Sequence, residues 1–205
     1  MGDSTGSARQ QPRRIIVGMS GASGAIYGIR LLRLLRSVGV ESHLVVSRSA
    51  QVTLACETDL RLPDLQTLAD VTYANGDIGA AISSGSFRGD GMVIAPCSIK
   101  TLSEVAGGCT TSLLSRAADV MLKERRRLVL MVRETPLHAG HIRSMAAVTE
   151  SGGIIYPPVP AFYAKPASLE EMVDYTLGRV LDLFDLHVPI TGRWTGAGNA
   201  VATTA

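Results

Sequence analysis

The fold of this chain is decided by residues 14–28, which read RIIVGMSGASGAIYG. The apolar run 14–19 has the composition of a buried strand, and it stops at a turn of small residues, 20–24. Apolar residues then recur at helical spacing through 25–37. Small residues in such a turn let the backbone approach a phosphate, and the N–H groups and hydroxyls there can donate to it. The stretch therefore predicts either an anion-binding turn or a tight turn that only packs a helix on a sheet.

Three further apolar runs also stop at polar residues suited to holding an anion. The runs, with the residues that follow them, are 42–46 (Ser47), 92–96 (Cys97 and Ser98) and 128–132 (Arg133 and Glu134). Helical patterns separate the runs, so we expect one doubly wound, mainly parallel sheet in a Rossmann-like or flavodoxin-like three-layer α/β fold. In such a sheet all the run ends lie along one edge, where open α/β sheets bind ligands.

The chain is long enough for one domain with a buried core, since it has 205 residues of which 46 % are hydrophobic. Residues 14–196 are expected to form that domain, because strand and helix patterns alternate there without a linker or repeat. The polar segment 1–13 and the small-residue segment 197–205 are expected to be flexible tails. The first of these segments lacks the apolar stretch of a signal peptide.

The secondary-structure patterns in the rest of the chain are uneven. A short fifth strand is predicted at 153–156, after a helical pattern. Ser168 with Glu171 three residues later predicts the start of the last long helix, which runs to about residue 186. Residues 59–90 give no readable pattern beyond a short apolar stretch and a serine-rich loop.

Composition excludes two classes of partner. The formal net charge is +2 with 19 % charged residues, which is too balanced for a protein that binds nucleic acid by neutralising phosphates. No apolar run approaches the roughly 20 residues that a membrane span needs. The three cysteines are odd in number and form no C-x-x-C pair, so neither a disulfide framework nor a cysteine-rich zinc site is expected. We therefore expect a cytoplasmic protein.

The glycine-rich turn lacks the spacing of the dinucleotide fingerprint, G-x-G-x-x-G, because Ser20 stands where the second glycine belongs. A nicotinamide enzyme would also carry an acidic residue at the end of the second strand, to hold a ribose hydroxyl. Here Ser47 and Arg48 occupy that place. The turn is not a P-loop either, since no G-K-[ST] follows it. A mononucleotide such as FMN therefore fits the pattern better than NAD.

Nine motifs occur in a fixed order between about residues 14 and 196. They are 21–28 (GASGAIYG), 57–59 (ETD), 82–87 (ISSGSF), 96–102 (PCSIKTL), 116–120 (RAADV), 122–126 (LKERR), 132–138 (VRETPLH), 157–163 (PPVPAFY) and 193–194 (RW). Together they resemble the flavin prenyltransferase family (UbiX type), of the homo-oligomeric flavin-containing cysteine decarboxylase superfamily. The motifs are long and cover nearly the whole folded chain, so the resemblance is specific.

The resemblance implies a metal-independent enzyme that transfers a dimethylallyl group from dimethylallyl phosphate to N5 and C6 of reduced FMN. Its product, prenylated FMN, is the cofactor of a partner decarboxylase. The resemblance also implies a homo-oligomer, a dodecamer built of trimers, with sites at the subunit contacts. Whether the donor is the monophosphate or the diphosphate stays open, as does the pathway served, ubiquinone synthesis or aromatic-acid decarboxylation.

The resemblance assigns three groups of site residues. FMN binding is assigned to Gly21, Ala22, Ser23, Ser47, Ser98, Ile99, Lys100, Thr101 and Arg133. Binding of the prenyl phosphate is assigned to Arg116, Lys123, Tyr163 and Arg179. Catalytic positions are Ser23, Glu57, Glu134 and Trp194.

The basic residues suit this chemistry. A prenyl phosphate ionises to a spread anion, and without a metal the side chains of Lys and Arg must stabilise it. Arg116 and Lys123 are seven residues apart on one predicted helix, and hence on one face of it. The alternative for each basic residue is a solvated surface charge.

For each of the other candidate catalytic residues, the sequence allows a catalytic role and a structural role. Trp194, the only tryptophan, can offer its π-face to an allyl cation or pack the C-terminal segment. Glu134 stands beside Arg133, with Ser23 on the opposite loop, and this carboxylate and hydroxyl can relay the proton released on ring closure. The alternative is a structural pair between Arg133 and Glu134.

Two other functions remain open. A flavin-dependent cysteine decarboxylase shares the implied fold, but its relatives carry a histidine after the first helix and a P-x-M-N motif, where this chain has His43 within a strand and the sequence PCS at 96–98. An accessory subunit that only holds FMN would not need a second phosphate pocket. His138 and His141 have a spacing that permits metal ligation, but no third ligand is near them in the sequence, so no metal is expected.

Overall fold

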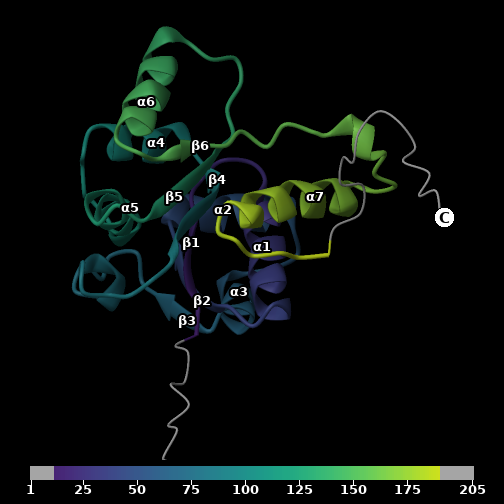
Figure 1. The fold of residues 1–205 in the computed structure, drawn as a ribbon, viewed down its shortest axis with the longest axis horizontal. Helices are drawn as coiled ribbons and strands as arrows, with labels where there is room; N and C mark the ends of the chain where they lie inside the picture. Colours follow the sequence, from purple (N-terminus) through teal and green to yellow (C-terminus); the bar gives the residue numbers. More distant parts are fainter. Residues whose placement is uncertain (1–11, 190–205) are drawn as a thin grey trace, which may run out of the picture.

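The computed structural model describes residues 12–189 as one sheet of six strands with helices packed on both of its faces (Figure 1). Every strand pair is parallel, and the strand order is β3-β2-β1-β4-β5-β6. The strands are β1 (Arg14–Met19), β2 (Glu41–Val46), β3 (Val71–Tyr73), β4 (Gly91–Cys97), β5 (Arg127–Val132) and β6 (Ile154–Ile155). The prediction of one doubly wound parallel sheet in a three-layer α/β fold is confirmed, and the strand order is that of the Rossmann type.

The carboxyl ends of β1 and β4 mark the point where the strand order reverses. β1 pairs with β2 on one side, and with β4 on the other. The chain builds outward from β1 to β3, then returns to the middle of the sheet and continues from β4 to β6. Ligands of open α/β sheets bind in the crevice at such a switch point. The edge that the sequence predicts as the site therefore contains the switch point.

Four strands lie where the apolar runs predict them. β2, β4 and β5 each begin one residue earlier than predicted, and β4 extends one residue further, to Cys97. β6 is shorter than the predicted strand 153–156. β3 lies within 59–90, the segment without a readable pattern, because a half-buried strand of three residues is too short for a periodic signal.

The helices form two layers. One face of the sheet is covered by α1 (Ala25–Ser37), α2 (Arg48–Glu57), α3 (Leu62–Leu68) and α7 (Leu169–Asp182). The other face is covered by α4 (Ile99–Ala106), α5 (Leu113–Lys123), α6 (Ala139–Glu150) and the short 3₁₀ turn η1 (Ala81–Ser83). Figure 1 shows α1 and α7 together on one side of the sheet, and α4, α5 and α6 on the other.

Alternate residues of each strand supply the two cores between the sheet and the helices. In β1, Ile15 and Val17 face the α1 layer, whereas Ile16 faces the α5 layer, and all three are fully buried. Burial of each such side chain stabilises the fold by roughly 1.5–3 kcal/mol. Because both faces are covered, β1, β4 and β5 each carry a continuous run of buried residues without polar alternation.

Gly28 lets α1 lie close over the ends of β1 and β4. A Cβ at this position would come within 2.6 Å of the Met19 sulfur and 2.7 Å of the Ala95 carbonyl oxygen. No side chain fits there, so the approach requires glycine. The contact holds the first turns of α1 beside the switch point.

α7 starts as predicted but ends earlier than the predicted end near residue 186. Ser168 Oγ caps the helix by accepting a hydrogen bond from the Glu171 N–H at 3.1 Å. At the other end, Asp185 has a φ of 54°, and the Leu186 N–H donates to the Leu181 carbonyl at 3.1 Å. This is a left-handed helix end. Leu186 stays buried beyond it, which is why the apolar pattern continues past the helix.

The predicted tails fall almost entirely outside the described residues. Arg13, the last residue of segment 1–13, donates from its guanidinium to the carbonyl oxygens of Phe184 and Asp185, at 2.6 and 3.2 Å. Segment 197–205 lies beyond the described part of the chain. Within residues 12–189, no helix has the length and apolar character to cross a membrane.

Candidate active site

A buried serine ties the turn after β1 to the start of α4. Ser20 Oγ donates to the Pro96 carbonyl oxygen at 3.0 Å and accepts from the Ser98 N–H at 2.7 Å. Its exposed fraction is 1 %. The serine therefore holds the two sides of the crevice together. The sequence places Ser20 in the turn 20–24 but does not predict this link between turn and helix; a serine in place of the fingerprint glycine is the signal for it.

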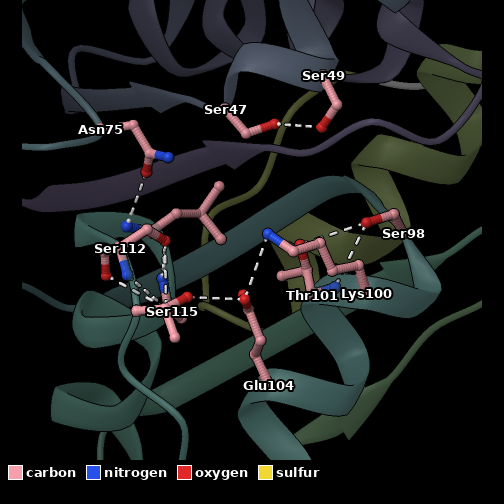
Figure 2. A network of polar contacts seen from close by, with 11 residues as sticks. Ser47, Ser49, Asn75, Ser98, Lys100, Thr101, Glu104, Ser112 and Ser115 are labelled. Atoms are coloured by element: carbon pink, nitrogen blue, oxygen red, sulfur yellow. Dashed lines mark hydrogen bonds and ion pairs between the residues drawn. The ribbon is translucent and has the colours of Figure 1, made fainter.

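Gly21 brings the same turn against the start of α2. A Cβ on Gly21 would come within 2.4 Å of the Ser49 Cβ. Ser47 caps α2, since its Oγ accepts from the Ala50 N–H at 3.1 Å, and the Ser47 and Ser49 hydroxyls lie 3.1 Å apart (Figure 2). Gly21 and Ser47, two of the residues predicted to bind FMN, therefore both lie against Ser49. Ser49 is missing from the predicted site, and its position just after a helix cap at the sheet edge is the signal for it.

The carboxylate of Glu57, at the end of α2, occupies the N-terminus of α1. Glu57 Oε2 accepts from the N–H groups of Gly24 and Ala25 at 2.9 and 2.8 Å. The Ser23 hydroxyl also hydrogen-bonds this carboxylate. Burial alone would raise the pKa of Glu57, but the Ser23 and backbone hydrogen bonds, together with the charge of Arg133, lower that pKa below its usual value. Glu57 is therefore ionised at neutral pH.

This arrangement narrows the expectation for the glycine-rich turn. The sequence predicts that N–H groups of the turn donate to a phosphate, but those of Gly24 and Ala25 donate to a carboxylate of the protein itself. An anionic ligand in the crevice can therefore accept hydrogen bonds from the other N–H groups of the turn and from the N-termini of α2 and α4.

The N-terminus of α4 lies on the other side of the crevice. Ser98 caps this helix, because its Oγ accepts from the Thr101 N–H at 3.4 Å. The Lys100 side chain is 80 % exposed and its ammonium pairs with Glu104 at 3.4 Å (Figure 2). Ile99 and Lys100 therefore offer an anion their backbone N–H groups, since the charge of Lys100 is engaged along the helix.

Arg133 and Glu134 follow β5 at the same edge of the sheet. The Arg133 N–H donates to the Cys97 carbonyl oxygen, the last of β4, at 3.1 Å. The positive charge of Arg133 also lowers the pKa of Glu57. Glu134 accepts from the Thr135 N–H at 2.9 Å. The sequence pairs Ser23 with Glu134 as a proton relay, whereas the carboxylate that contacts Ser23 is Glu57. The difference arises because α2 carries Glu57 back over the turn after β1, a contact between distant segments.

Two other sequence candidates have structural roles. Cys97 is fully buried, and burial raises the pKa of its thiol far above the usual range, so the thiol stays protonated. His138 Nδ1 accepts from the Gly140 N–H at 3.0 Å and caps α6, with its ring 3.6 Å from that of His141. Among residues 12–189, no group of three or more His, Cys, Asp or Glu side chains is placed to hold a metal ion.

Arg116 and Lys123 lie on α5, beside the loop that precedes β4. Arg116 Nε donates to the Ser83 carbonyl oxygen at 3.2 Å. Lys123 forms an ion pair with Glu124, and a Cβ on Gly85 would lie 2.9 Å from the Lys123 ammonium. Both basic residues therefore line the same loop, which confirms that they share one face of one helix.

Tyr163 and Arg179 lie in the opposite layer. Tyr163 belongs to the 3₁₀ turn η2 (Phe162–Ala164), and its hydroxyl lies 2.7 Å from that of Tyr175. Arg179 pairs with Asp182 at 2.8 Å. Burial raises the pKa of Tyr156, and the charge of Arg179 opposes this rise. Arg179 is thus close enough to Tyr156 for its charge to act on that phenol.

The four residues assigned to the prenyl phosphate are divided between the two layers. α5 carries Arg116 and Lys123 on one face of the sheet, and the segment with Tyr163 and Arg179 packs on the other. Trp194, the last predicted catalytic residue, lies outside residues 12–189.

Most of the chain resembles proteins of one family. The family model described as Flavoprotein matches residues 3–181. A curated relative from Thauera aromatica, named flavin prenyltransferase UbiX, is 59 % identical over 183 residues, which are 89 % of this chain and 94 % of the relative.

Two solved structures share both fold and sequence. One is described as AnUbiX (PadA1) in complex with FMN and dimethylallyl pyrophosphate. It has a TM-score of 0.89 and 52 % identity, and the match covers 91 % of this chain and 99 % of the other. The second is described as a dodecameric FMN-dependent Ubix-like decarboxylase from Escherichia coli O157:H7. It has a TM-score of 0.87 and 46 % identity, over 89 % of this chain and 100 % of the other. With matches of this identity and length, the chain belongs to the UbiX-type flavin prenyltransferases of the flavoprotein family.

Proposed function

We propose that this protein transfers the dimethylallyl group of dimethylallyl phosphate to N5 and C6 of reduced FMN, and so makes prenylated FMN for a partner decarboxylase. The observation that carries the proposal is the full-length likeness, at 52 % identity, to a structure described as binding FMN and dimethylallyl pyrophosphate. FMN is a substrate in this reaction, and we propose that no metal takes part.

The switch point suits the phosphate of FMN. The capped N-termini of α2 and α4 flank the turn after β1 and offer backbone N–H groups and the hydroxyls of Ser47 and Ser98. Helix N-termini favour anions through these N–H groups and the helix dipole. We assign FMN to this crevice, with contacts from Gly21, Ala22, Ser23, Ser47, Ser98, Ile99, Lys100, Thr101 and Arg133.

The cluster of Ser23, Glu57 and Arg133 suits proton transfer. Ring closure at C6, an aromatic carbon, releases a proton, and an ionised carboxylate in hydrogen-bond contact with a hydroxyl can take it up. Glu57 meets both conditions, since its pKa is lowered and it contacts Ser23. We propose catalytic roles for Ser23 and Glu57, with Glu134 at the same edge. A role for Trp194 as π-face for the allyl cation rests on the sequence alone.

The basic residues suit the leaving phosphate. When the C–O bond of the donor breaks, the phosphate departs with the bonding electrons, and cations must stabilise it. We propose that Arg116, Lys123, Tyr163 and Arg179 do so. Because they lie in two helix layers, we propose that the pocket combines side chains of more than one copy of the chain. We therefore propose a homo-oligomer, a dodecamer as described for the Escherichia coli relative.

A cytoplasmic location is part of the proposal. Cys56, Cys97 and Cys109 are free thiols, and such thiols persist in a reducing compartment. Reduced FMN, the proposed substrate, is likewise stable only under reducing conditions.

Mass spectrometry of the bound flavin tests the proposal. The purified protein is incubated anaerobically with reduced FMN and either dimethylallyl phosphate or dimethylallyl diphosphate. We expect a flavin enlarged by one prenyl unit with at least one donor. Lys123→Ala is expected to keep FMN but lose the transfer. Unmodified flavin with both donors contradicts the proposal and favours an accessory FMN-holding subunit, whereas turnover of a C-terminal cysteine peptide favours the decarboxylase.

A further inference from the structure

Tyr175 anchors the segment that carries Tyr163. Tyr175 lies on α7 with an exposed fraction of 7 %, whereas Tyr163 is 55 % exposed on η2. Their hydroxyl oxygens are 2.7 Å apart, and their rings meet edge to face with centroids 6.0 Å apart. A buried, helix-borne phenol therefore contacts the hydroxyl of a predicted site residue that is itself largely exposed.

η2 is a short turn of three residues. Ala161, which precedes the turn, makes no side-chain cap, and Lys165 after it has a φ of 47°. The neighbouring Phe162 is 77 % exposed. The hydrogen bond and ring contact with Tyr175 thus help to fix where the Tyr163 hydroxyl lies.

The same face of α7 carries the cation of this half of the site. Tyr175 and Arg179 are four residues apart, one turn of the helix, so they project from the same face. The charge of Arg179 acts on both Tyr175 and Tyr156. The hydroxyl that Tyr175 holds is therefore positioned beside a guanidinium.

The hydroxyls of Tyr163 and Tyr175 form one hydrogen bond at 2.7 Å, and a phenol oxygen can donate one hydrogen bond and accept others. The bond with Tyr175 therefore fixes the position of the Tyr163 hydroxyl without using up its capacity for hydrogen bonds.

We propose that Tyr175 is a positioning residue of the prenyl-phosphate site: its hydroxyl hydrogen-bonds that of Tyr163, and so holds the Tyr163 hydroxyl where it can contact the phosphate next to Arg179. The inference rests on the proposed function for the roles of Tyr163 and Arg179. Tyr175 itself does not touch the substrate.

Removing the Tyr175 hydroxyl tests the inference. In Tyr175→Phe we expect the Kd of the FMN-loaded protein for dimethylallyl phosphate to rise about 3- to 10-fold, the worth of one hydrogen bond. The KM for the prenyl donor should rise in parallel, while the flavin affinity and the melting temperature stay unchanged. Tyr163→Phe should give a similar or larger rise, and the double variant should bind no more weakly than Tyr163→Phe alone.

Tyr73→Phe is the matched control, because it removes a hydroxyl that bonds the buried His43 at 2.9 Å, away from this face. We expect it to leave donor binding unchanged. The inference is overturned if the Kd increases of the two single variants multiply in the double variant. It is also overturned if Tyr175→Phe weakens the binding of flavin as well as of the donor, because Tyr175 is then a structural residue. If the unsubstituted protein binds the donor without prenylating flavin, the proposed reaction is wrong, and the binding data alone still decide the role of Tyr175. If it does not bind the donor, both proposals fail.

Discussion

Arg116 and Arg179 lie in helix layers on opposite faces of the sheet, on α5 and α7. Both are proposed to bind one prenyl phosphate. If the pocket is shared between copies of the chain, each copy contributes its α5 face to one site and its α7 face to another. The arrangement makes subunit mixing a direct test of the site.

We expect Arg116→Ala and Arg179→Ala to be inactive alone and to recover activity when co-expressed. In a random mixture, about a quarter of the sites receive an intact α5 from one copy and an intact α7 from another. Prenylated flavin formed per bound FMN, measured by mass spectrometry, should therefore return to roughly that fraction of the unsubstituted level.

Arg116→Ala mixed with Lys123→Ala is the matched control. Both residues lie on α5, so no copy in this mixture supplies an intact α5 face. This mixture should stay inactive. Equal activity of the two mixtures, or none in either, would show that the sites are not shared in this way.

Ser47→Asp separates the helix cap from the anion site. Aspartate caps helices as well as serine does, so the melting temperature should change little. The added charge lies where the FMN phosphate is proposed to bind, so we expect the flavin affinity to fall by tenfold or more through like-charge repulsion. Flavin titration by fluorescence quenching measures this.

Ser47→Ala gives the reverse pattern. It removes the cap on the Ala50 N–H, which should cost about 1 kcal/mol of unfolding free energy, but it adds no charge. The flavin affinity should fall less than in Ser47→Asp. Unchanged affinity in Ser47→Asp would remove Ser47 from the flavin site.

The sequence predicts which residues lie at the sheet edge, because the local pattern of apolar residues indicates which segments are buried strands and where they end. The run 14–19 and the helix 25–37 match β1 and α1 in the structure. Contacts between segments that are distant in the sequence leave no such local pattern. Neither the carboxylate of Glu57 over the N-terminus of α1 nor the place of Ser49 against Gly21 follows from any spacing. The family resemblance names Arg116 and Arg179 but does not show that they lie on opposite faces.

Glu57→Gln should lower stability in a pH-dependent way. Burial raises the pKa of Glu57, but the Ser23 and backbone hydrogen bonds and the charge of Arg133 outweigh it and lower the pKa from its usual 4.5. A carboxylate with a lowered pKa stabilises the folded state above about pH 4.5, and this stabilisation is lost as the pH falls through the folded value.

We expect Glu57→Gln to cost about 0.5–1 kcal/mol of unfolding free energy at pH 7, since the carboxylate is partly exposed at a helix N-terminus. The difference from the unsubstituted protein should shrink below pH 4, in urea melts across the pH range. Prenyl transfer should fall as well. Asp64→Asn is the control, because Asp64 accepts from the Arg61 N–H at 2.7 Å at the start of α3, outside the site. A pH-independent cost in Glu57→Gln would contradict the ionised role.

Gly21→Ala should disturb the flavin site through Ser49. The new Cβ would come within 2.4 Å of the Ser49 Cβ and 2.5 Å of its Oγ, so the turn or α2 must move. Overpacking of this kind typically costs about 1–3 kcal/mol, and we expect the unfolding free energy to fall by about that amount. We expect flavin affinity to fall by tenfold or more as the turn moves away from Ser47.

Ser49→Gly in the same chain should restore much of both quantities, because it removes the two side-chain atoms that the new Cβ would meet. Gly76→Ala provides the control, since a Cβ there has nothing within 4 Å, and it should leave flavin binding unchanged. The Ser49 backbone carbon, 3.2 Å from the new Cβ, limits the recovery to a partial one. A Gly21→Ala protein that binds flavin normally, or one that Ser49→Gly does not improve, would show that the contact between the turn and α2 does not shape the site.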